Sequence, residues 1–226
     1  MAQQIFPGVY VVDGKIATAN LTVGFKVYGE KIVQEGGAEY RIWDLYRSKL
    51  AAAIHNGLKN MPIRPGSAVL YLGASTGTTA SHVSDIVGKE GVVYCIEFAQ
   101  RPMLKLLRVC EKKENMLPIM ADARQPKDYA VQIGKKVDVI YQDVAQPDQD
   151  KILVENSRML LKDGGWAMVA VKSQSIDVTK KPHEIFEEFK NKISEEISIQ
   201  EEVMLEPYDF EHLFLVGRKK QRQVLH

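Results

Sequence analysis

The chain has 226 residues, of which 45% are hydrophobic and 26% are charged. These proportions exclude a disordered or fibrous chain and predict a soluble globular protein with one main domain and a small annex. The net charge of +1 excludes a protein that binds nucleic acid through its own charge alone, so any RNA substrate would need partners that supply much of the affinity.

Signals for membrane insertion and secretion do not appear in the sequence. No apolar run approaches the roughly 20 residues of a membrane helix, and the start MAQQIFPGVYV lacks the basic and apolar regions of a signal peptide. Cys95 and Cys110 are too few for a disulfide framework, and we expect buried free thiols in a reducing compartment. We therefore expect a cytoplasmic protein that does not act at a membrane.

The N-terminal part predicts a small antiparallel sheet followed by a helix. Short β-prone runs lie between Val9 and Val33, including one over 16–28, and Asp13-Gly14 is a typical hairpin turn. Residues 40–58 then show helical spacing of apolar side chains, and this helix is expected to link two domains. We place the domains at 1–52, with the small β domain and the linking helix, and at 53–226.

The second domain alternates strands with helices, which predicts a doubly wound parallel sheet with helices on both faces. The two final runs, joined by a turn around Pro207, are expected to be antiparallel neighbours. The predicted strands are 68–73, 91–98, 116–123, 137–145, 165–173, 197–206 and 212–219, and the predicted helices are 79–87, 101–114, 126–131, 149–161 and 182–195.

The stretch LYLGASTGTTASHVSDIVG, residues 70–88, passes from a buried strand through a glycine turn into a helix. A helix N-terminus favours anions. However, Gly77 is followed by Thr78 and Thr79 without the lysine of a P-loop, and the spacing G-x-x-x-G does not fit the dinucleotide fingerprint. The turn is therefore expected to hold a group smaller than a pyrophosphate.

Acids end three strands at the edge where open α/β sheets bind ligands. Glu97 comes 24 positions after Gly73, and Asp122 and Asp143 end the next two strands. Any one of them could simply cap a helix or stay solvated. Together with the glycine turn they favour S-adenosylmethionine, with Glu97 on the ribose hydroxyls, Asp122 on the adenine amine, the turn on the methionine end and Asp143 near the sulfonium. Phe98 could lie against the adenine or belong to the core.

Lys172 ends the fifth strand and is expected beside Asp143, where the pair could also be a plain salt bridge. A ribose hydroxyl must lose its proton as it attacks a methyl group. We expect the Lys172 amine to accept it if desolvation or Lys49 lowers its pKa against the pull of Asp143. Asp143 and water stay open as acceptors. The connection before His212 falls on the same edge and should bring His212 towards Lys172.

Five segments of the sequence resemble the fibrillarin family of RNA 2'-O-methyltransferases, and the resemblance runs from about Tyr10 to Lys219. They read YRIWDLYRSKLAAAI, YLGASTGTTASHVSDIVG, IEFAQRP, DVAQPDQ and VAVKSQSIDVTKKP. The chain resembles the archaeal form, because it lacks a Gly/Arg-rich N-terminal extension. The resemblance implies a Rossmann-like methyltransferase fold, a seven-stranded sheet with an antiparallel last strand, preceded by a small antiparallel β domain.

The resemblance also implies the site residues, with no metal among the ligands. S-adenosylmethionine would be bound by Gly73, Thr78, Thr79, Glu97, Phe98, Asp122, Ala123, Gln142, Asp143, Val144 and Ala145. The implied catalytic residues are Lys49, Asp143, Lys172 and His212. Arg47 and Lys49 would contact RNA, Arg47 at a phosphate and Lys49 at the reacting ribose.

The implied partners are a box C/D guide RNA, its target rRNA or tRNA, a Nop-type scaffold protein and a kink-turn-binding ribosomal protein. Base pairing with the guide would select the target nucleotide during rRNA and tRNA processing. Two other functions stay open. A nucleotide-binding assembly subunit without catalysis is disfavoured by the intact Lys49, Asp143 and Lys172, and an NAD-dependent dehydrogenase by the missing third glycine.

Overall fold

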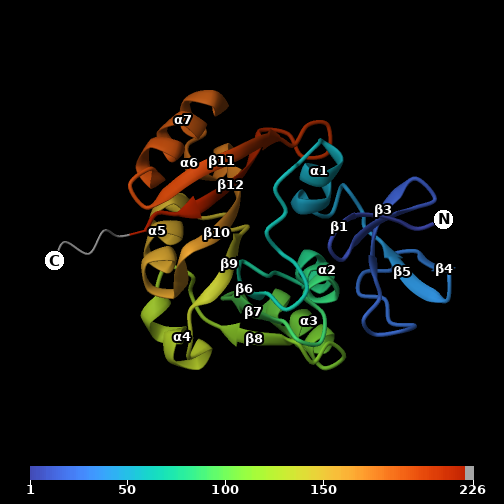
Figure 1. Ribbon diagram of the computed structural model, residues 1–226. Helices are drawn as coiled ribbons and strands as arrows, with labels where there is room; N and C mark the ends of the chain where they lie inside the picture. The colour runs from blue at the N-terminus through green and yellow to red at the C-terminus, as the bar shows by residue number, and fades with distance from the viewer. Residues whose placement is uncertain (222–226) are drawn as a thin grey trace.

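The computed structural model describes residues 1–221, which form two β-sheets with a short helix, α1, between them (Figure 1). The N-terminal sheet is antiparallel, as predicted, in the strand order β1-β2-β3-β5-β4. Asp13 and Gly14 both have positive φ and form the predicted turn between β2 and β3. The strands are β1 (Gln3–Phe6), β2 (Val9–Val12), β3 (Lys15–Ala19), β4 (Ile32–Glu35) and β5 (Ala38–Ile42).

The β-prone run predicted over 16–28 is too long, because β3 ends at Ala19. Beyond it, the amide of Asn20 donates to the carbonyl oxygen of Glu39 at 2.7 Å, and the amide of Gly24 donates to the Glu39 side chain, also at 2.7 Å. Glu39 therefore satisfies the main-chain amides of Asn20 and Gly24, which in a strand would donate to a neighbouring strand.

The helix predicted over 40–58 begins too early. Gly36-Gly37 makes a hairpin between β4 and β5, and β5 also pairs with β3, so the first residues of the predicted helix are extended. The helix itself, α1 (Lys49–His55), begins where the Ser48 hydroxyl accepts a hydrogen bond from the amide of Ala51. The predicted domain boundary after residue 52 falls inside α1 and stays a prediction.

The larger sheet has seven strands in the order β11-β12-β10-β9-β6-β7-β8, and each predicted strand is present in it. Adjacent strands from β10 to β8 are parallel, whereas β12 is antiparallel to β10 and to β11, which confirms the antiparallel last strand. The strands are β6 (Ala68–Leu72), β7 (Val92–Glu97), β8 (Met116–Met120), β9 (Val137–Gln142), β10 (Leu161–Lys172), β11 (Ile197–Met204) and β12 (His212–Lys219).

The strand order reverses between β6 and β9, because the chain runs from β6 to β7 and β8 on one side and continues from β9 to β10 on the other. In open sheets of this kind, the crevice at the carboxyl ends of the two strands on either side of the reversal receives the ligand. The topology therefore places the candidate site at the ends of β6 and β9.

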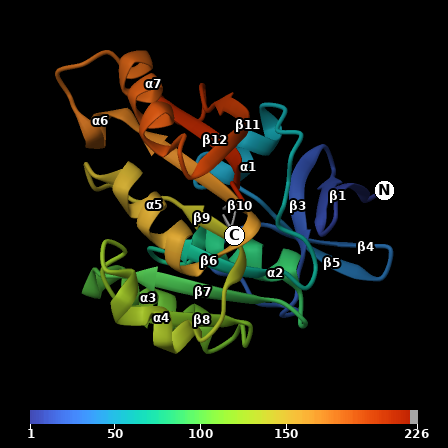
Figure 2. The same ribbon diagram turned by 60° about the vertical axis from the view of Figure 1, so that its left-hand side comes forward.

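Helices cover both faces of the larger sheet (Figure 1). The buried side chains of α1 to α3 pack with β1–β3 residues on one face, and those of α4, α5 and α7 form a second cluster on the other. Figure 2 shows the same layers from a second direction. The remaining helices are α2 (Thr78–Val87), α3 (Gln100–Cys110), α4 (Pro126–Ile133), α5 (Gln149–Leu160), α6 (Ser173–Ile176) and α7 (Pro182–Ile193).

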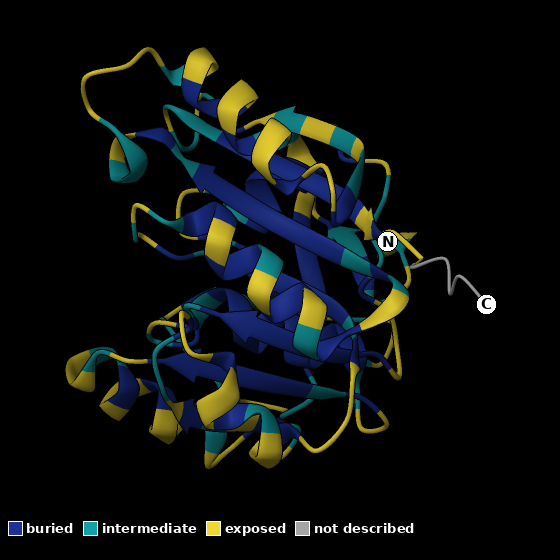
Figure 3. Cartoon of the chain, turned by 90° about the vertical axis from the view of Figure 1, so that its left-hand side faces the viewer, coloured by how far each residue is buried: buried dark blue, intermediate teal, exposed yellow. Residues whose placement is uncertain are grey.

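Burial follows these layers. Figure 3 shows the central strands as buried and the helices as alternately buried and exposed, which is the pattern of a sheet covered on both faces. Cys95 is buried in β7 and Cys110 is half-buried at the end of α3, and both are free thiols. Among residues 1–221, no helix is long and apolar enough to cross a bilayer.

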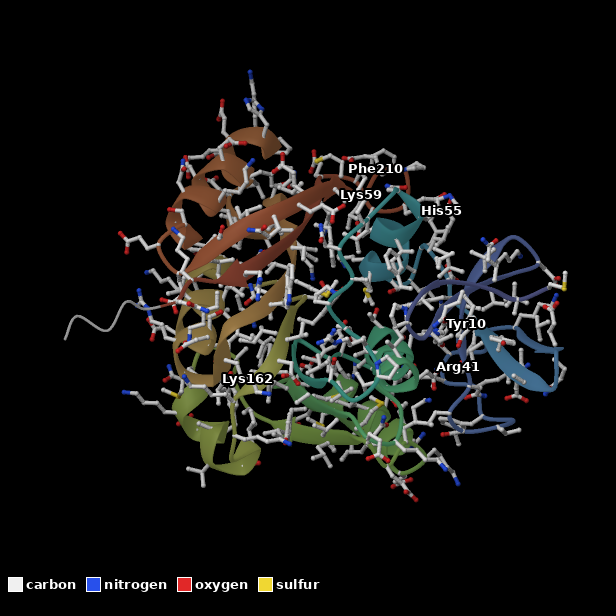
Figure 4. All side chains as sticks on the ribbon, in the orientation of Figure 1. Tyr10, Arg41, His55, Lys59, Lys162 and Phe210 are labelled. Atoms are coloured by element: carbon white, nitrogen blue, oxygen red, sulfur yellow. The ribbon has the colours of Figure 1, made fainter. Side chains whose placement is uncertain are left out.

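A buried ionic network joins the N-terminal sheet to α2. The guanidinium of Arg41, in β5, contacts Glu30 at 2.6 Å and Asp85 at 2.8 Å, and it donates to the Ser81 hydroxyl at 2.9 Å. The ammonium of Lys113 also contacts Asp85, and all of these side chains are essentially inaccessible to solvent. Figure 4 labels Arg41 at this junction between the sheet and α2.

His82, the residue after Ser81 in α2, also contacts the N-terminal part of the chain. Its two ring nitrogens lie 2.7 Å from the hydroxyls of Thr18 and Tyr28, and its ring stacks on Trp43 with 4.6 Å between ring centres. Burial, reinforced by the nearby positive charge of Arg41, holds the pKa of His82 well below its usual range. The imidazole is therefore neutral in the folded protein.

Candidate active site

The glycine turn after β6 approaches the end of β9 so closely that a side chain would not fit. Gly73 has φ +80, and a Cβ at this position would lie 2.5 Å from the carbonyl oxygen of Asp143. Gly77, also with positive φ, directly precedes α2. Both glycines are thus required by the backbone, and the turn forms one wall of the crevice between β6 and β9.

Glu97, at the carboxyl end of β7, is fixed by the backbone around it. One of its carboxylate oxygens accepts from the amide of Ser75, in the glycine turn, and the other from the amide of Ala99, both at 2.8 Å. The residue is only 7% exposed. Each oxygen keeps a further acceptor site, so the oriented carboxylate can bind a pair of hydroxyl groups.

Asp143 lies between two ammonium groups at the end of β9. Its Oδ1 is 2.8 Å from Nζ of Lys172 and 3.4 Å from Nζ of Lys49. Burial alone would raise the pKa of Asp143, but the charges of Lys172 and then Lys49 outweigh it and hold this pKa below its usual range. The predicted contact between Lys172 and Asp143 is therefore confirmed, and the carboxylate is ionised.

The connection between β11 and β12 completes this cluster. The β10–β12 register pairs Lys172 with His212, which confirms that His212 lies towards Lys172. Asp209, in the same connection, places one oxygen 3.3 Å from Nζ of Lys49 and the other 3.1 Å from Nδ1 of His212. Burial opposes the charged form of Lys49, but Asp143 and Asp209 together raise its pKa.

Asp209 was missed by the sequence prediction. The only available signal was an acid three positions before His212 in a loop that was already placed at the active edge. Figure 4 labels Phe210, the next residue, beside α1, where the connection meets the helix that carries Lys49.

A pocket of about 320 Å³ opens in front of these groups. Most of the predicted cofactor residues lie in its wall, as does Ser75 of the glycine turn, whereas the sequence prediction missed Ile96, Ala121 and Gln146. The Gln146 side-chain oxygen is buried without a hydrogen-bond partner in the described part of the chain. The predicted residues that line the pocket are Gly73, Glu97, Phe98, Ala123, Asp143, Val144, Ala145 and Lys172.

Four predicted cofactor residues lie outside this pocket wall. Thr78 begins α2 behind the glycine turn, and the Thr79 hydroxyl donates to that of Ser48 at 3.0 Å. The Gln142 side chain is buried and donates to the carbonyl oxygen of Gln149. The fourth residue, Asp122, is held by the guanidinium of Arg124, at 2.6 Å for the shortest contact.

The segment before α1 carries two exposed side chains, Tyr46 and Arg47. The Arg47 side chain is 59% exposed and its guanidinium lies 5.8 Å from the centre of the Tyr28 ring and 3.9 Å from Asp44. This position leaves most of its donors free for a phosphate, whereas Lys49 is directed into the cluster with Asp143. RNA contact by Arg47 stays a prediction.

The arrangement suits the activation of a hydroxyl group. A carboxylate between two ammonium groups can orient a hydroxyl by accepting its proton in a hydrogen bond while the ammonium groups donate to its oxygen. The neighbouring pocket, with an oriented diol acceptor in Glu97 and an unpartnered amide oxygen in Gln146, fits an adenosine cofactor. The same edge can therefore hold a donor and an acceptor of a transferred group.

Comparison with known proteins agrees with this geometry. A family model described as "Fibrillarin" matches residues 1–221. The "Fibrillarin-like rRNA/tRNA 2'-O-methyltransferase" of Pyrococcus furiosus is 54% identical to this chain over 219 residues, which cover 95% of this chain and 96% of that protein.

Three solved structures are similar over almost the whole chain. Methanococcus jannaschii fibrillarin, a pre-rRNA processing protein, has a TM-score of 0.93 at 49% identity and covers 98% of both chains. Aeropyrum pernix fibrillarin, in complex with natively bound S-adenosyl-L-methionine, has a TM-score of 0.88 at 44% identity, covering 96% of this chain and 97% of that one. A fibrillarin/Nop5p complex has a TM-score of 0.88 at 38% identity, covering 96% of this chain and 100% of that one.

Proposed function

Because this chain belongs to the fibrillarin family, we propose that it transfers a methyl group from S-adenosylmethionine to ribose 2'-hydroxyls of rRNA and tRNA. The observation that carries this function is the cluster in which Asp143 contacts Lys172 and Lys49 beside a pocket for adenosine. The curated relative with 54% identity is named for this reaction. The chain is therefore an RNA 2'-O-methyltransferase.

The cofactor site is proposed from the wall of the pocket. Glu97 accepts the two ribose hydroxyls, because the amides of Ser75 and Ala99 already orient its oxygens. The glycine turn holds the methionine end at the reversal point of the sheet. The adenine amine is the proposed partner of Asp122, whose carboxylate also holds Arg124.

In the reaction, S-adenosylmethionine supplies an electrophilic methyl group on a sulfonium. The residues of the chain bind and orient the nucleophile. Asp143 holds the ammonium groups of Lys172 and Lys49 in place, and these groups donate hydrogen bonds to the oxygen of the target 2'-hydroxyl. Holding the hydroxyl oxygen in line with the methyl group converts a slow encounter into an intramolecular step.

Partners supply the target. A Nop-type scaffold protein is a partner in the assembly, in line with the fibrillarin/Nop5p complex that is similar to this chain. We further propose a box C/D guide RNA and a kink-turn-binding ribosomal protein. The net charge of +1 supports this, because a nearly neutral chain gains little affinity from phosphate neutralisation by itself.

The function is tested by reconstitution. The chain is assembled with a guide RNA, the scaffold protein, the kink-turn protein and labelled S-adenosylmethionine, and methylation of the guided nucleotide is mapped. We expect label on the 2'-oxygen of that nucleotide and none when the guide is mismatched. A particle that assembles but transfers no methyl group would instead identify a non-catalytic assembly subunit.

A further inference from the structure

The hydrogen bonds around His212 determine which of its ring nitrogens carries a proton. Nδ1 lies 2.7 Å from the main-chain oxygen of Phe210 and 3.1 Å from the carboxylate of Asp209. Both atoms can only accept, so the hydrogen of the neutral imidazole is on Nδ1. Nε2 has no hydrogen-bond partner within residues 1–221 and keeps its lone pair free.

The other basic groups of the cluster are poorly placed to take a proton. Nζ of Lys172 forms an ion pair with Asp143 at 2.8 Å, and Lys49 lies between Asp143 and Asp209, which raise its pKa against the effect of burial. A protonated lysine has only donors. The pKa of Asp143 is itself lowered by these two lysines, so this carboxylate is a weak base.

We propose that Nε2 of His212 accepts the proton of the target 2'-hydroxyl and that Asp209 is the residue that positions His212 for this role. The proposal rests on the methyltransferase function. A bond forms between the 2'-oxygen and the methyl carbon, the bond from sulfur to that carbon breaks, and its electron pair stays on sulfur. The hydroxyl proton moves to Nε2, so His212 becomes an imidazolium next to the Asp209 carboxylate.

The charges around His212 support this direction of proton transfer. Asp209 is within contact distance, whereas Lys172 is its register partner on β10 and Lys49 is on the far side of Asp209. Asp143 forms ion pairs with both lysines. Asp209 therefore screens His212 from Lys49 and stabilises the imidazolium that forms, as the carboxylate of a hydrolase triad does for its histidine.

The test is the pH profile of methyl transfer in the reconstituted particle, under single-turnover conditions with saturating S-adenosylmethionine. Histidine is the side chain whose ordinary titration falls between about pH 5 and 8. We expect the wild-type rate to rise with pH through this range and then level off. His212→Gln should lower the plateau by about 10²- to 10⁴-fold, the usual contribution of a general base, and should abolish the rise.

Asp209 is tested by its effect on the same curve. Asp209→Asn should move the rise to lower pH, because the carboxylate no longer stabilises the imidazolium, while the affinity for S-adenosylhomocysteine stays unchanged. Asp209→Glu should restore most of the shift. Glu211→Gln is the matched control, since this acid lies in the same connection but bonds to Gln174 instead, and its profile should equal that of the wild type.

The outcomes separate this proposal from the function on which it rests. A wild-type particle that forms no 2'-O-methyl product overturns the function. An active wild type with a His212→Gln variant that keeps the rise overturns the proton acceptor, and an Asp209→Asn profile identical to the wild type overturns the positioning role. If the variants do not fold, the ¹⁵N shifts of His212 in the wild-type protein decide, because a neutral ring protonated at Nε2 contradicts the proposal.

Discussion

Gly73 shows how much of the site depends on the absence of a side chain. Its positive φ disfavours any other residue, and the Asp143 carbonyl oxygen fills the place of a Cβ. The two effects act on different properties. The backbone conformation costs stability wherever it occurs, whereas the close approach to β9 shapes the cofactor pocket.

Gly73→Ala should separate these effects when compared with Gly134→Ala. Gly134 has a similar φ of +69, and its added Cβ would make only an ordinary contact at 3.8 Å. Both variants should lose about 1–2 kcal/mol for the left-handed backbone, and Gly73→Ala should lose about 1–3 kcal/mol more from overpacking. Chemical denaturation measures stability, and calorimetric titration should show weaker S-adenosylhomocysteine binding only for Gly73→Ala. Equal binding by both variants contradicts the pocket geometry.

Glu97→Gln should weaken the binding of S-adenosylmethionine by about 1–3 kcal/mol, the range for losing a hydrogen bond to a charged acceptor. The substitution keeps the size of the side chain, so the pocket does not collapse. Titration calorimetry with S-adenosylhomocysteine is the measurement. Glu90→Gln, which changes an exposed acid in the turn before the same strand, is the control. If a folded Glu97→Gln protein bound S-adenosylhomocysteine with wild-type affinity, Glu97 would not be the acceptor for the ribose hydroxyls.

Among the elements, the strands of the larger sheet were the most predictable. The central strands β6, β7 and β9 are buried and nearly continuous in apolar residues, so burial on two faces left a clear pattern in the sequence. The active edge was predictable for the same reason, because parallel strands end together. Asp143 comes directly after β9, and Lys172 is the last residue of β10, which pairs with β9.

The segments that were predicted wrongly owe their structure to distant partners. Residues 20–24 form a loop because Glu39 accepts the amides of Asn20 and Gly24, and β5 is a strand because β3 and β4 lie on either side of it. Neither partner is visible in a local pattern. The role of Asp209 depends likewise on how a loop folds over Lys49, which no spacing rule specifies.

The helix α2 carries a testable dependence of stability on pH. His82 has a folded pKa well below its ordinary value of 6.5, because it is buried and faces Arg41 and Lys113. His82 therefore binds a proton in the unfolded chain at a pH where it stays neutral in the folded protein. The free energy of unfolding should fall as the pH drops below about 6.5. One such group gives at most about 1.4 kcal/mol per pH unit.

The measurement is the free energy of unfolding between about pH 5 and 8, a range that spans the ordinary histidine titration. His82→Gln should flatten the dependence, whatever its effect on absolute stability. His183→Gln removes an exposed histidine and should leave the slope as it is. A His82→Gln protein with the wild-type slope would show that other groups control the acid response.

At the scale of the whole molecule, the ionic network at the junction ties the two sheets together. Asp85→Asn should cost about 3–5 kcal/mol, because it leaves the cations of Arg41 and Lys113 buried without their shared carboxylate. Scanning calorimetry should show a single transition for the wild type, since α2 and the N-terminal sheet share this network. Glu188→Gln, which breaks an exposed pair with Lys180, should change stability very little. Two separate transitions in the wild type would mean that the sheets unfold independently.

The register that pairs Lys172 with His212 also limits how this chain can change in length during evolution. Leu213 and Leu215 pack into one buried cluster and Phe214 and Val216 into the other, on opposite faces of the sheet. One inserted or deleted residue within β12 would exchange these two sets and turn His212 away from its neighbours. Length changes in descendants of this chain should therefore accumulate in turns outside the ladder, while the number of residues from His212 to the end of β12 stays constant.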